Sequence, residues 1–155
     1  CGYYPDMNRC RCTPAQVGQY LGKLSQPLLD RLDLCADVSP VDFDGMSNGK
    51  IGENTKQVRM RVEAAQQIQR ERFKDEKIQF NGEMSGKQVE NFCHLDDSAG
   101  RLLKMAFQHM PFSARAYHRI LKVARTIADL EGKDRIGVEH LGQALFFRNQ
   151  NVLRE

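Results

Sequence analysis

One arginine lies between a short helical turn and a predicted strand, where its side chain would be held in a fixed position. The segment SQPLLDRLDL covers residues 25–34 and places Arg31 between Asp30 and Asp33. A rigid, planar guanidinium that reaches a neighbour's γ-phosphate stabilises the charge that develops during phosphoryl transfer. Arg31 is therefore a candidate catalytic arginine finger acting on an adjacent subunit. The alternative is a surface ion pair with Asp30 or Asp33.

A second arginine, Arg115, falls in the first turn of a predicted helix that begins after Ser113. A cation at this end is slightly unfavourable against the helix dipole, so an anion bound nearby would explain it. The N–H groups of the first turn and the guanidinium could bind a phosphate together. Arg119 and Lys122 continue the same polar face. The alternative is an ordinary solvated basic face.

Three of the five cysteines, Cys1, Cys10 and Cys12, are crowded into the first twelve residues. Zn²⁺ takes four ligands in a tetrahedron and binds thiolates, so these residues are candidate metal ligands. We expect a fourth ligand to precede the chain. The Cys-X-Cys spacing differs from the usual two to four intervening residues, and unstructured free thiols are the alternative. With no sign of secretion, we do not expect a disulfide framework.

Other motifs that could carry chemistry fail on spacing. The loop GMSNGKI (residues 45–51) is superficially like a phosphate-binding loop, but three residues separate its glycines instead of four. Ile51 also stands where Ser or Thr must reach Mg²⁺. The four histidines have no metal-binding spacing, and Cys93 and His94, adjacent in sequence, are not expected to face each other.

The elements that must position the candidate residues are mostly helices. Alternation of Leu32, Leu34, Ala36 and Val38 with polar residues or cysteine predicts one strand, followed by a loop over residues 39–53. Periodicity and capping residues predict six helices, over residues 15–24, 54–73, 85–92, 96–111, 113–132 and 138–148. The long helix 54–73 is expected to bury a stripe that contains Val58, Val62, Ala65 and Ile68.

Composition sets the class of protein. Hydrophobic residues make up 41% and charged residues 28% of 155 residues, which is ordinary for a soluble domain. The net charge of +3 is too small to indicate nucleic acid by itself, and no apolar run approaches the ~20 residues of a membrane span. The chain has neither a signal peptide nor an initiator Met, so we expect a piece of a longer cytoplasmic protein.

Three stretches together resemble the ComM/YifB group of magnesium-chelatase-like AAA+ ATPases: CGYY…CRCTPAQ, YL…LS…PLLDRLDL and SARAYHRILKVARTIADL. The resemblance covers essentially the whole chain. It implies that residues 1–45 are the tail of the AAA+ core and that residues 46–155 form its α-helical C-terminal lid. The expected fold is mainly α, a helical bundle preceded by one short strand left over from the α/β core, and residues 1–45 are expected to be partly disordered.

By the same resemblance, Arg31 matches the arginine finger that acts in trans, and Arg115 matches the nucleotide-binding sensor-2 arginine. Cys1, Cys10 and Cys12 match the last three cysteines of the family's CPCG…CxC pattern. The resemblance implies that the intact protein uses ATP and Mg²⁺ and assembles into a hexameric ring. It also implies that this ring acts on DNA as a branch-migration motor in bacterial transformation. Walker A, Walker B and sensor 1 are absent from this chain, so we expect it to be inactive alone and a monomer or weak oligomer.

Two other functions fit the residues. A separate helical DNA-binding module would use the basic residues Arg59, Arg61, Arg70, Arg72 and Arg119, and its affinity would fall steeply with salt. A structural zinc module would depend on the three N-terminal cysteines alone.

Overall fold

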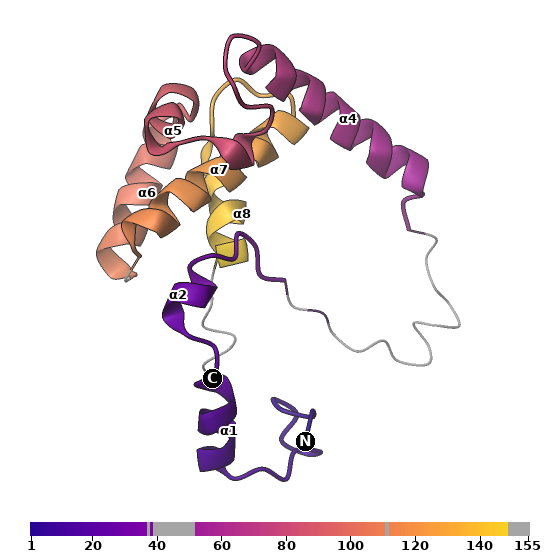
Figure 1. The fold of residues 1–155 in the computed structure, drawn as a ribbon, viewed down its shortest axis with the longest axis vertical. Helices are drawn as coiled ribbons and strands as arrows, with labels where there is room; N and C mark the ends of the chain where they lie inside the picture. The colour runs from indigo at the N-terminus through magenta and orange to yellow at the C-terminus, as the bar shows by residue number, and fades with distance from the viewer. Residues whose placement is uncertain (37, 39–51, 111, 149–155) are drawn as a thin grey trace.

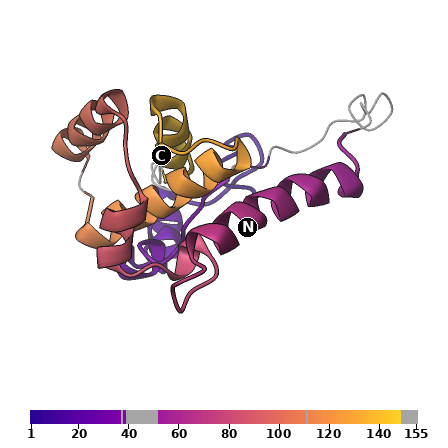
Figure 2. The ribbon, with the colours of Figure 1, turned by 90° about the horizontal axis from the view of Figure 1, so that it is seen from above.

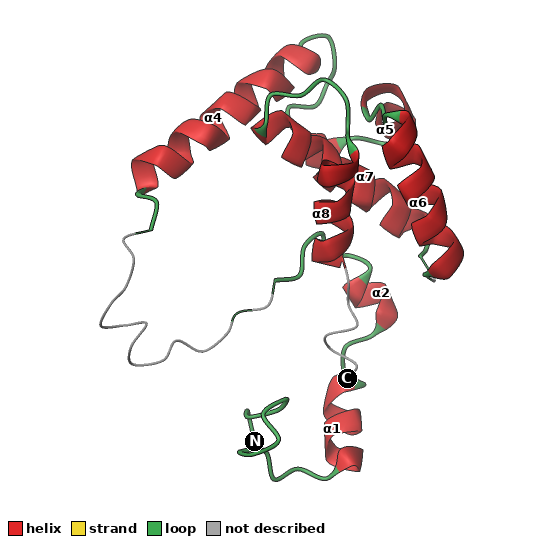
Figure 3. Ribbon diagram, turned by 180° about the vertical axis from the view of Figure 1, so that it is seen from behind, coloured by secondary structure: helices red, strands yellow, loops and turns green. Residues whose placement is uncertain are grey.

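The computed structural model describes residues 1–36, 38, 52–110 and 112–148, and Figure 1 shows their arrangement. The described residues form helices joined by loops, without any strand, as Figure 3 shows by colour. The mainly helical fold class is therefore confirmed. The elements are α1 (Pro14–Leu21), α2 (Gln26–Leu29), α4 (Thr55–Arg72), η1 (Asn81–Glu83), α5 (Gly86–Phe92), α6 (Asp97–His109), α7 (Ala114–Leu130) and α8 (Val138–Arg148).

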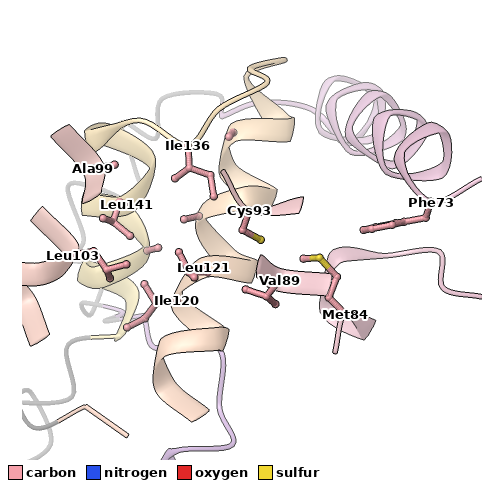
Figure 4. Packing of buried hydrophobic residues seen from close by; sticks show 13 residues of the cluster. Phe73, Met84, Val89, Cys93, Ala99, Leu103, Ile120, Leu121, Ile136 and Leu141 are labelled. Atoms are coloured by element: carbon pink, nitrogen blue, oxygen red, sulfur yellow. The ribbon is translucent and has the colours of Figure 1, made fainter. Parts of the chain in front are cut away.

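Helix α7 is the centre of a bundle formed by α4 to α8. It contacts α4, η1, α5 and α8, while α6 packs against α8 (Figures 1 and 2). Ile120 and Leu121 of α7 lie among Leu103 of α6, Leu141 of α8 and Val89 of α5 (Figure 4). Each such side chain contributes about 1.5–3 kcal/mol by leaving water, so burial on α7 is the main support of the bundle.

Local signals set where the helices begin and end, as predicted. Ser85 and Gln88 form a reciprocal capping box at the start of α5, and Asp96 caps α6 through a 2.7 Å bond from the Ala99 N–H. Gly132 ends α7 with a φ of 66°, which an L side chain rarely adopts. The N–H of Lys133 donates to the carbonyl of Ala128 and that of Gly132 to Asp129, which is a Schellman motif.

A pair of main-chain hydrogen bonds joins the turn before α6 to the loop before α8. The Asp96 N–H donates to the Ile136 carbonyl at 3.0 Å, and the Ile136 N–H donates to the His94 carbonyl at 2.9 Å. Leu95 and Ile136 thus form an isolated parallel bridge beside the core, in which Ile136 is fully buried. The bridge fixes where α6 and α8 start relative to each other.

Residues 1–24, called here the N-terminal arm, extend away from the bundle (Figures 1 and 3). The arm contains α1, which begins with a capping box between Thr13 and Gln16. None of its residues is buried, and the Tyr20 side chain on α1 is 70% exposed. The arm therefore has local helix signals but no hydrophobic core of its own.

The strand predicted around Leu32, Leu34 and Ala36 is wrong for the described residues, which form a turn and irregular backbone. A strand needs a neighbour for its backbone hydrogen bonds, and no other described segment supplies a strand edge. Instead, the Cys35 N–H donates to the carbonyl of Phe147, near the end of α8, at 2.8 Å. Most of the loop predicted over 39–53 lies outside the described residues.

The long helix α4 is confirmed, but the prediction of its apolar stripe holds only for its C-terminal half. Ala65 is buried and Ile68 half-buried, whereas Val58 is 40% and Val62 43% exposed. Figure 2 shows the first half of α4 projecting beyond the bundle. The periodic pattern is real, but none of the described chain covers it there.

Candidate functional site

The first turn of α7 presents Arg115 on a well-defined helix end. The Ser113 hydroxyl caps the helix by accepting from the Ala116 N–H at 3.1 Å. Ala114 and Arg115 are exposed, and Arg115 makes no hydrogen bond or ion pair within the described chain. The turn is thus open to solvent and carries an exposed guanidinium, and the prediction that it binds an anion stays a prediction.

The other two cations on this polar face of α7 bind within the chain. Arg119 donates to the Arg31 carbonyl at 2.6 Å and pairs with Asp33. Lys122 donates to the Gly82 carbonyl at 2.9 Å. Burial, and then the charge of Arg119, lower the pKa of Lys122. Arg119 and Lys122 therefore hold neighbouring segments, and Arg115 alone of the three remains available.

Arg31 follows the short helix α2 and has an exposed side chain. Its Nη1 donates to the Pro27 carbonyl at 3.1 Å, four residues earlier. The neighbouring carboxylates bind elsewhere: Asp30 accepts from Ser113 and Arg148, and Asp33 pairs with Arg119. Both carboxylates considered as ion-pair partners of Arg31 are thus engaged by other described residues.

A buried arginine ties the segment that carries Arg31 to the bundle. Arg148 is 4% exposed; its Nη2 donates to Asp30 Oδ1 at 3.1 Å, and its Nη1 donates to the Leu32 carbonyl. Asp30 Oδ2 accepts from the Ser113 hydroxyl at 3.1 Å. Asp30, Ser113 and Arg148 are called here the Asp30 clasp.

The Asp30 clasp links the two segments that carry the candidate arginines. Arg31 follows Asp30 directly, and Arg115 lies two residues after Ser113. Charge-assisted hydrogen bonds between partly buried groups are the stronger kind, so a movement of α2 would be transmitted to the start of α7. Sequence reasoning missed this contact because its partners are 83 and 118 residues apart.

A second buried network fixes the other end of α7. Asp129 has a fully buried carboxylate that accepts from Arg125 at 3.1 Å, from Arg72 and from the Asn81 amide at 2.7 Å. Burial is the main cause that lowers the pKa of Arg125, and the Asp129 charge opposes it. The spacing of Arg125 and Asp129, four residues apart on one helix, was the signal available in the sequence.

Several arginines of the basic surface considered for DNA binding form ion pairs within the chain. Arg72 is occupied by Asp129, Arg119 by Asp33, and Arg61 by Glu53 through two 2.7 Å hydrogen bonds. Arg59 and Arg70 stay exposed on α4. Three of the five arginines are thus paired with carboxylates, which weakens the separate DNA-binding hypothesis.

The three N-terminal cysteines, predicted from the sequence as metal ligands, lie close together. Two turns fold the chain back: the Asp6 N–H donates to the Tyr3 carbonyl, and the Cys10 N–H donates to the Asp6 carbonyl, both at 2.8 Å. The sulfur atoms of Cys1, Cys10 and Cys12 all lie within 4.8 Å of one another. Such an arrangement could hold a thiophilic metal ion.

The described helices do not include one that is both long and apolar enough to cross a bilayer.

Two family models together match most of the chain. Residues 52–148 match the family model described as magnesium chelatase, subunit ChlI C-terminal. Residues 1–46 match the family model described as magnesium chelatase, subunit ChlI. The first match covers the whole bundle from α4 to α8, and the second covers the three N-terminal cysteines and Arg31.

Curated relatives align with nearly the full chain. Competence protein ComM of Haemophilus influenzae is 40% identical over 95% of this chain, and protein YifB of Salmonella typhimurium is 38% identical over 95%. Protein YifB of Escherichia coli is 37% identical over the same share. The chain spans only 28% of the length of each of these relatives.

Proposed function

The chain belongs to the magnesium chelatase ChlI family, and from that premise we propose that it is the nucleotide-sensing C-terminal portion of a ring-forming AAA+ ATPase. In this proposal residues 1–45 complete the ATPase core and residues 46–155 form the lid. ATP and Mg²⁺ are the substrate and ion of the longer protein, bound largely by residues outside this chain.

The observation that carries the proposal is the state of Arg115. It is exposed on the capped first turn of α7, without a partner among the described residues, although both other cations on that face are in use. A helix N-terminus and a guanidinium together suit the γ-phosphate of ATP bound to the same subunit. Arg115 would stabilise that phosphate and report its loss through a movement of the lid.

Arg31 has the second role, on the nucleotide of the adjacent subunit. Its exposed side chain leaves the surface from a backbone that the Asp30 clasp holds, with Arg119 on its carbonyl. An arginine finger must be fixed in its backbone and accessible at its tip; the Arg31 side chain is exposed, and its Nη1 is held on the Pro27 carbonyl of its own segment. The clasp would then couple the sensing of one nucleotide to the finger that acts on the next.

The substrate of the motor is proposed to be DNA. The Haemophilus relative is named a competence protein, which supports a DNA-linked role for the intact protein. The pairing of Arg61, Arg72 and Arg119 with carboxylates favours DNA contacts in the assembled ring over contacts by this portion alone. Stimulation of ATP hydrolysis by DNA in the full-length protein, with little binding by the 155-residue chain, is the expected result.

The test is ATP hydrolysis by full-length Arg31→Ala and Arg115→Ala proteins, with Arg135→Ala, another exposed arginine, as the matched control. We expect each of the first two variants to lose roughly 10²-fold or more in turnover, since an arginine that meets transition-state charge contributes on that scale. The control should keep wild-type turnover. Near-wild-type turnover in both test variants would dispose of the proposal.

A mixing experiment separates the two roles. Arg31→Ala subunits are combined with subunits that cannot bind ATP but retain Arg31. If Arg31 acts on the adjacent subunit, mixed rings regain activity, because the second kind of subunit supplies the missing finger. Arg115→Ala subunits treated in the same way should stay inactive, since Arg115 serves the nucleotide of its own subunit.

A further inference from the structure

The N-terminal arm keeps a defined shape with almost no hydrophobic support. None of residues 1–24 is buried, and its half-buried residues are few: Tyr4, Cys10, Cys12, Val17 and Leu21. A surface hollow lies between the cysteine turns and α1, and Tyr4, Val17 and Tyr20 are among the residues that line it. Segments this short seldom hold together unless a disulfide or a metal joins them.

The spacing of the sulfur atoms distinguishes between these two kinds of link. Cys1 Sγ and Cys10 Sγ are 3.6 Å apart, and Cys12 Sγ lies within 4.8 Å of both. A disulfide requires about 2.05 Å. Two thiolates on a tetrahedral zinc, each with a Zn–S bond of about 2.3 Å, lie roughly 3.8 Å apart. The cluster therefore has the dimensions of a metal site rather than of a disulfide.

The charges around the cluster suit bound thiolates. Three thiolates on a divalent ion leave a net charge of about −1. Arg9 and Arg11 line a second hollow together with Cys1, and Arg11 lies between Cys10 and Cys12 in the sequence. Their guanidinium groups can offset the remaining negative charge.

We propose that Cys1, Cys10 and Cys12 bind one structural Zn²⁺ that takes the place of a hydrophobic core in the N-terminal arm. Binding forms three Zn–S bonds, and each thiol that becomes a thiolate releases one proton without any change of oxidation state. Among the described residues no fourth histidine, cysteine or carboxylate lies with these three, so water or a residue outside them completes the tetrahedron. Fixing the arm would hold α1 and, through it, the approach to α2.

The experiment measures metal content in the full-length protein purified under reducing conditions. Wild type is compared with a Cys10→Ser, Cys12→Ser double variant and with Cys35→Ser, a half-buried cysteine outside the cluster. We expect the double variant to hold about one Zn²⁺ per chain less than wild type, as a single site requires. The Cys35→Ser control should match wild type. Equal zinc in all three proteins would overturn the proposal.

Two measurements on the wild-type protein keep the proposal testable even if the double variant does not fold. Exchange of the metal for Co²⁺ should give the intense near-ultraviolet absorption of thiolate-to-cobalt charge transfer. Chelation should make the bond between Arg9 and Cys10 sensitive to trypsin, while cleavage after Arg135 stays unchanged. Absence of the thiolate band, or iron with visible absorption in place of zinc, overturns the assignment. This outcome is independent of ATP hydrolysis, so the roles of Arg31 and Arg115 stand or fall separately.

Discussion

The bundle around α7 and the N-terminal arm use the same local signals but differ in what lies behind them. Capping boxes start both α1 in the arm and α5 in the bundle. Val89 of α5 is 1% exposed, whereas α1 has no buried residue. Local signals are therefore sufficient to begin a helix in both regions, but only the bundle adds tertiary burial, from which most helical stability comes.

The difference also separates the two proposed functions. The bundle presents Arg115 on a rigid helix end, which a sensor of nucleotide requires. The arm presents three thiols on a segment without a core, which a structural metal site can stabilise. Each substitution below changes one region and measures whether the other responds.

The largest expected effect comes from Asp129→Ala in the bundle. The change leaves Arg125 buried and Arg72 partly buried without their shared carboxylate, and removing one partner of a buried ion pair costs about 3–5 kcal/mol. Urea unfolding followed by circular dichroism measures the loss. Glu71→Ala removes only an exposed ion pair with Lys74 and is the control, expected within about 1 kcal/mol of wild type. Similar midpoints for the two variants would contradict a central role for the network.

The Asp30 clasp comes next, because it joins the segment around α2, which follows the arm, to the bundle. Arg148→Ala leaves the carboxylate of Asp30 and the carbonyl of Leu32 without their buried donor, at an expected cost of about 2–3 kcal/mol. Amide exchange should rise at Arg31 and Leu32, whose N–H groups bond within the turn. Arg135→Ala serves as the control, with exchange there unchanged. Unaltered exchange at Arg31 in Arg148→Ala would show that the clasp does not hold α2.

A pH-dependent loss of stability is expected from Cys93 in the core. Burial raises the pKa of this thiol from 9.0 to about 11. Since the folded state favours the neutral thiol, its contribution is complete below pH 9 and is lost as the pH rises toward 11. A shift of about two pKa units corresponds to roughly 2–3 kcal/mol. Unfolding free energies measured from pH 8 to 11 should fall less steeply in Cys93→Ala than in wild type, and parallel curves would refute the assignment.

The parts of the fold that could be predicted are those that depend on neighbours in sequence. Ser85, Asp96, Ser113 and Gly132 mark helix ends because each acts on backbone groups within a few residues. The cysteine cluster belongs to the same class, since its members lie within twelve residues. The strand at Leu32 to Val38 failed because a strand depends on a distant partner that the described chain does not supply.

In the candidate site, too, the features set by neighbours in sequence could be predicted and those set by distant residues could not. Arg115 was found from its place in a helix turn, but the contacts that distinguish it from Arg119 and Lys122 come from residues 31, 33 and 82. Arg72 was placed on a basic surface because its partner, Asp129, is 57 residues away. Charge type and helical spacing identify which residues can bind an anion, whereas long-range packing decides which of them remain available.

The smallest expected effect tests the comparison most directly, because one substitution type is made in both regions. Ser85→Ala removes the cap of α5 and should lower the unfolding free energy of the bundle by about 1 kcal/mol. Thr13→Ala removes the equivalent cap of α1 but should leave that value unchanged, since α1 contributes no buried residue. Its effect should appear only as greater trypsin cleavage after Lys23. An equal loss of bundle stability in both variants would mean that the arm is part of the same cooperative unit.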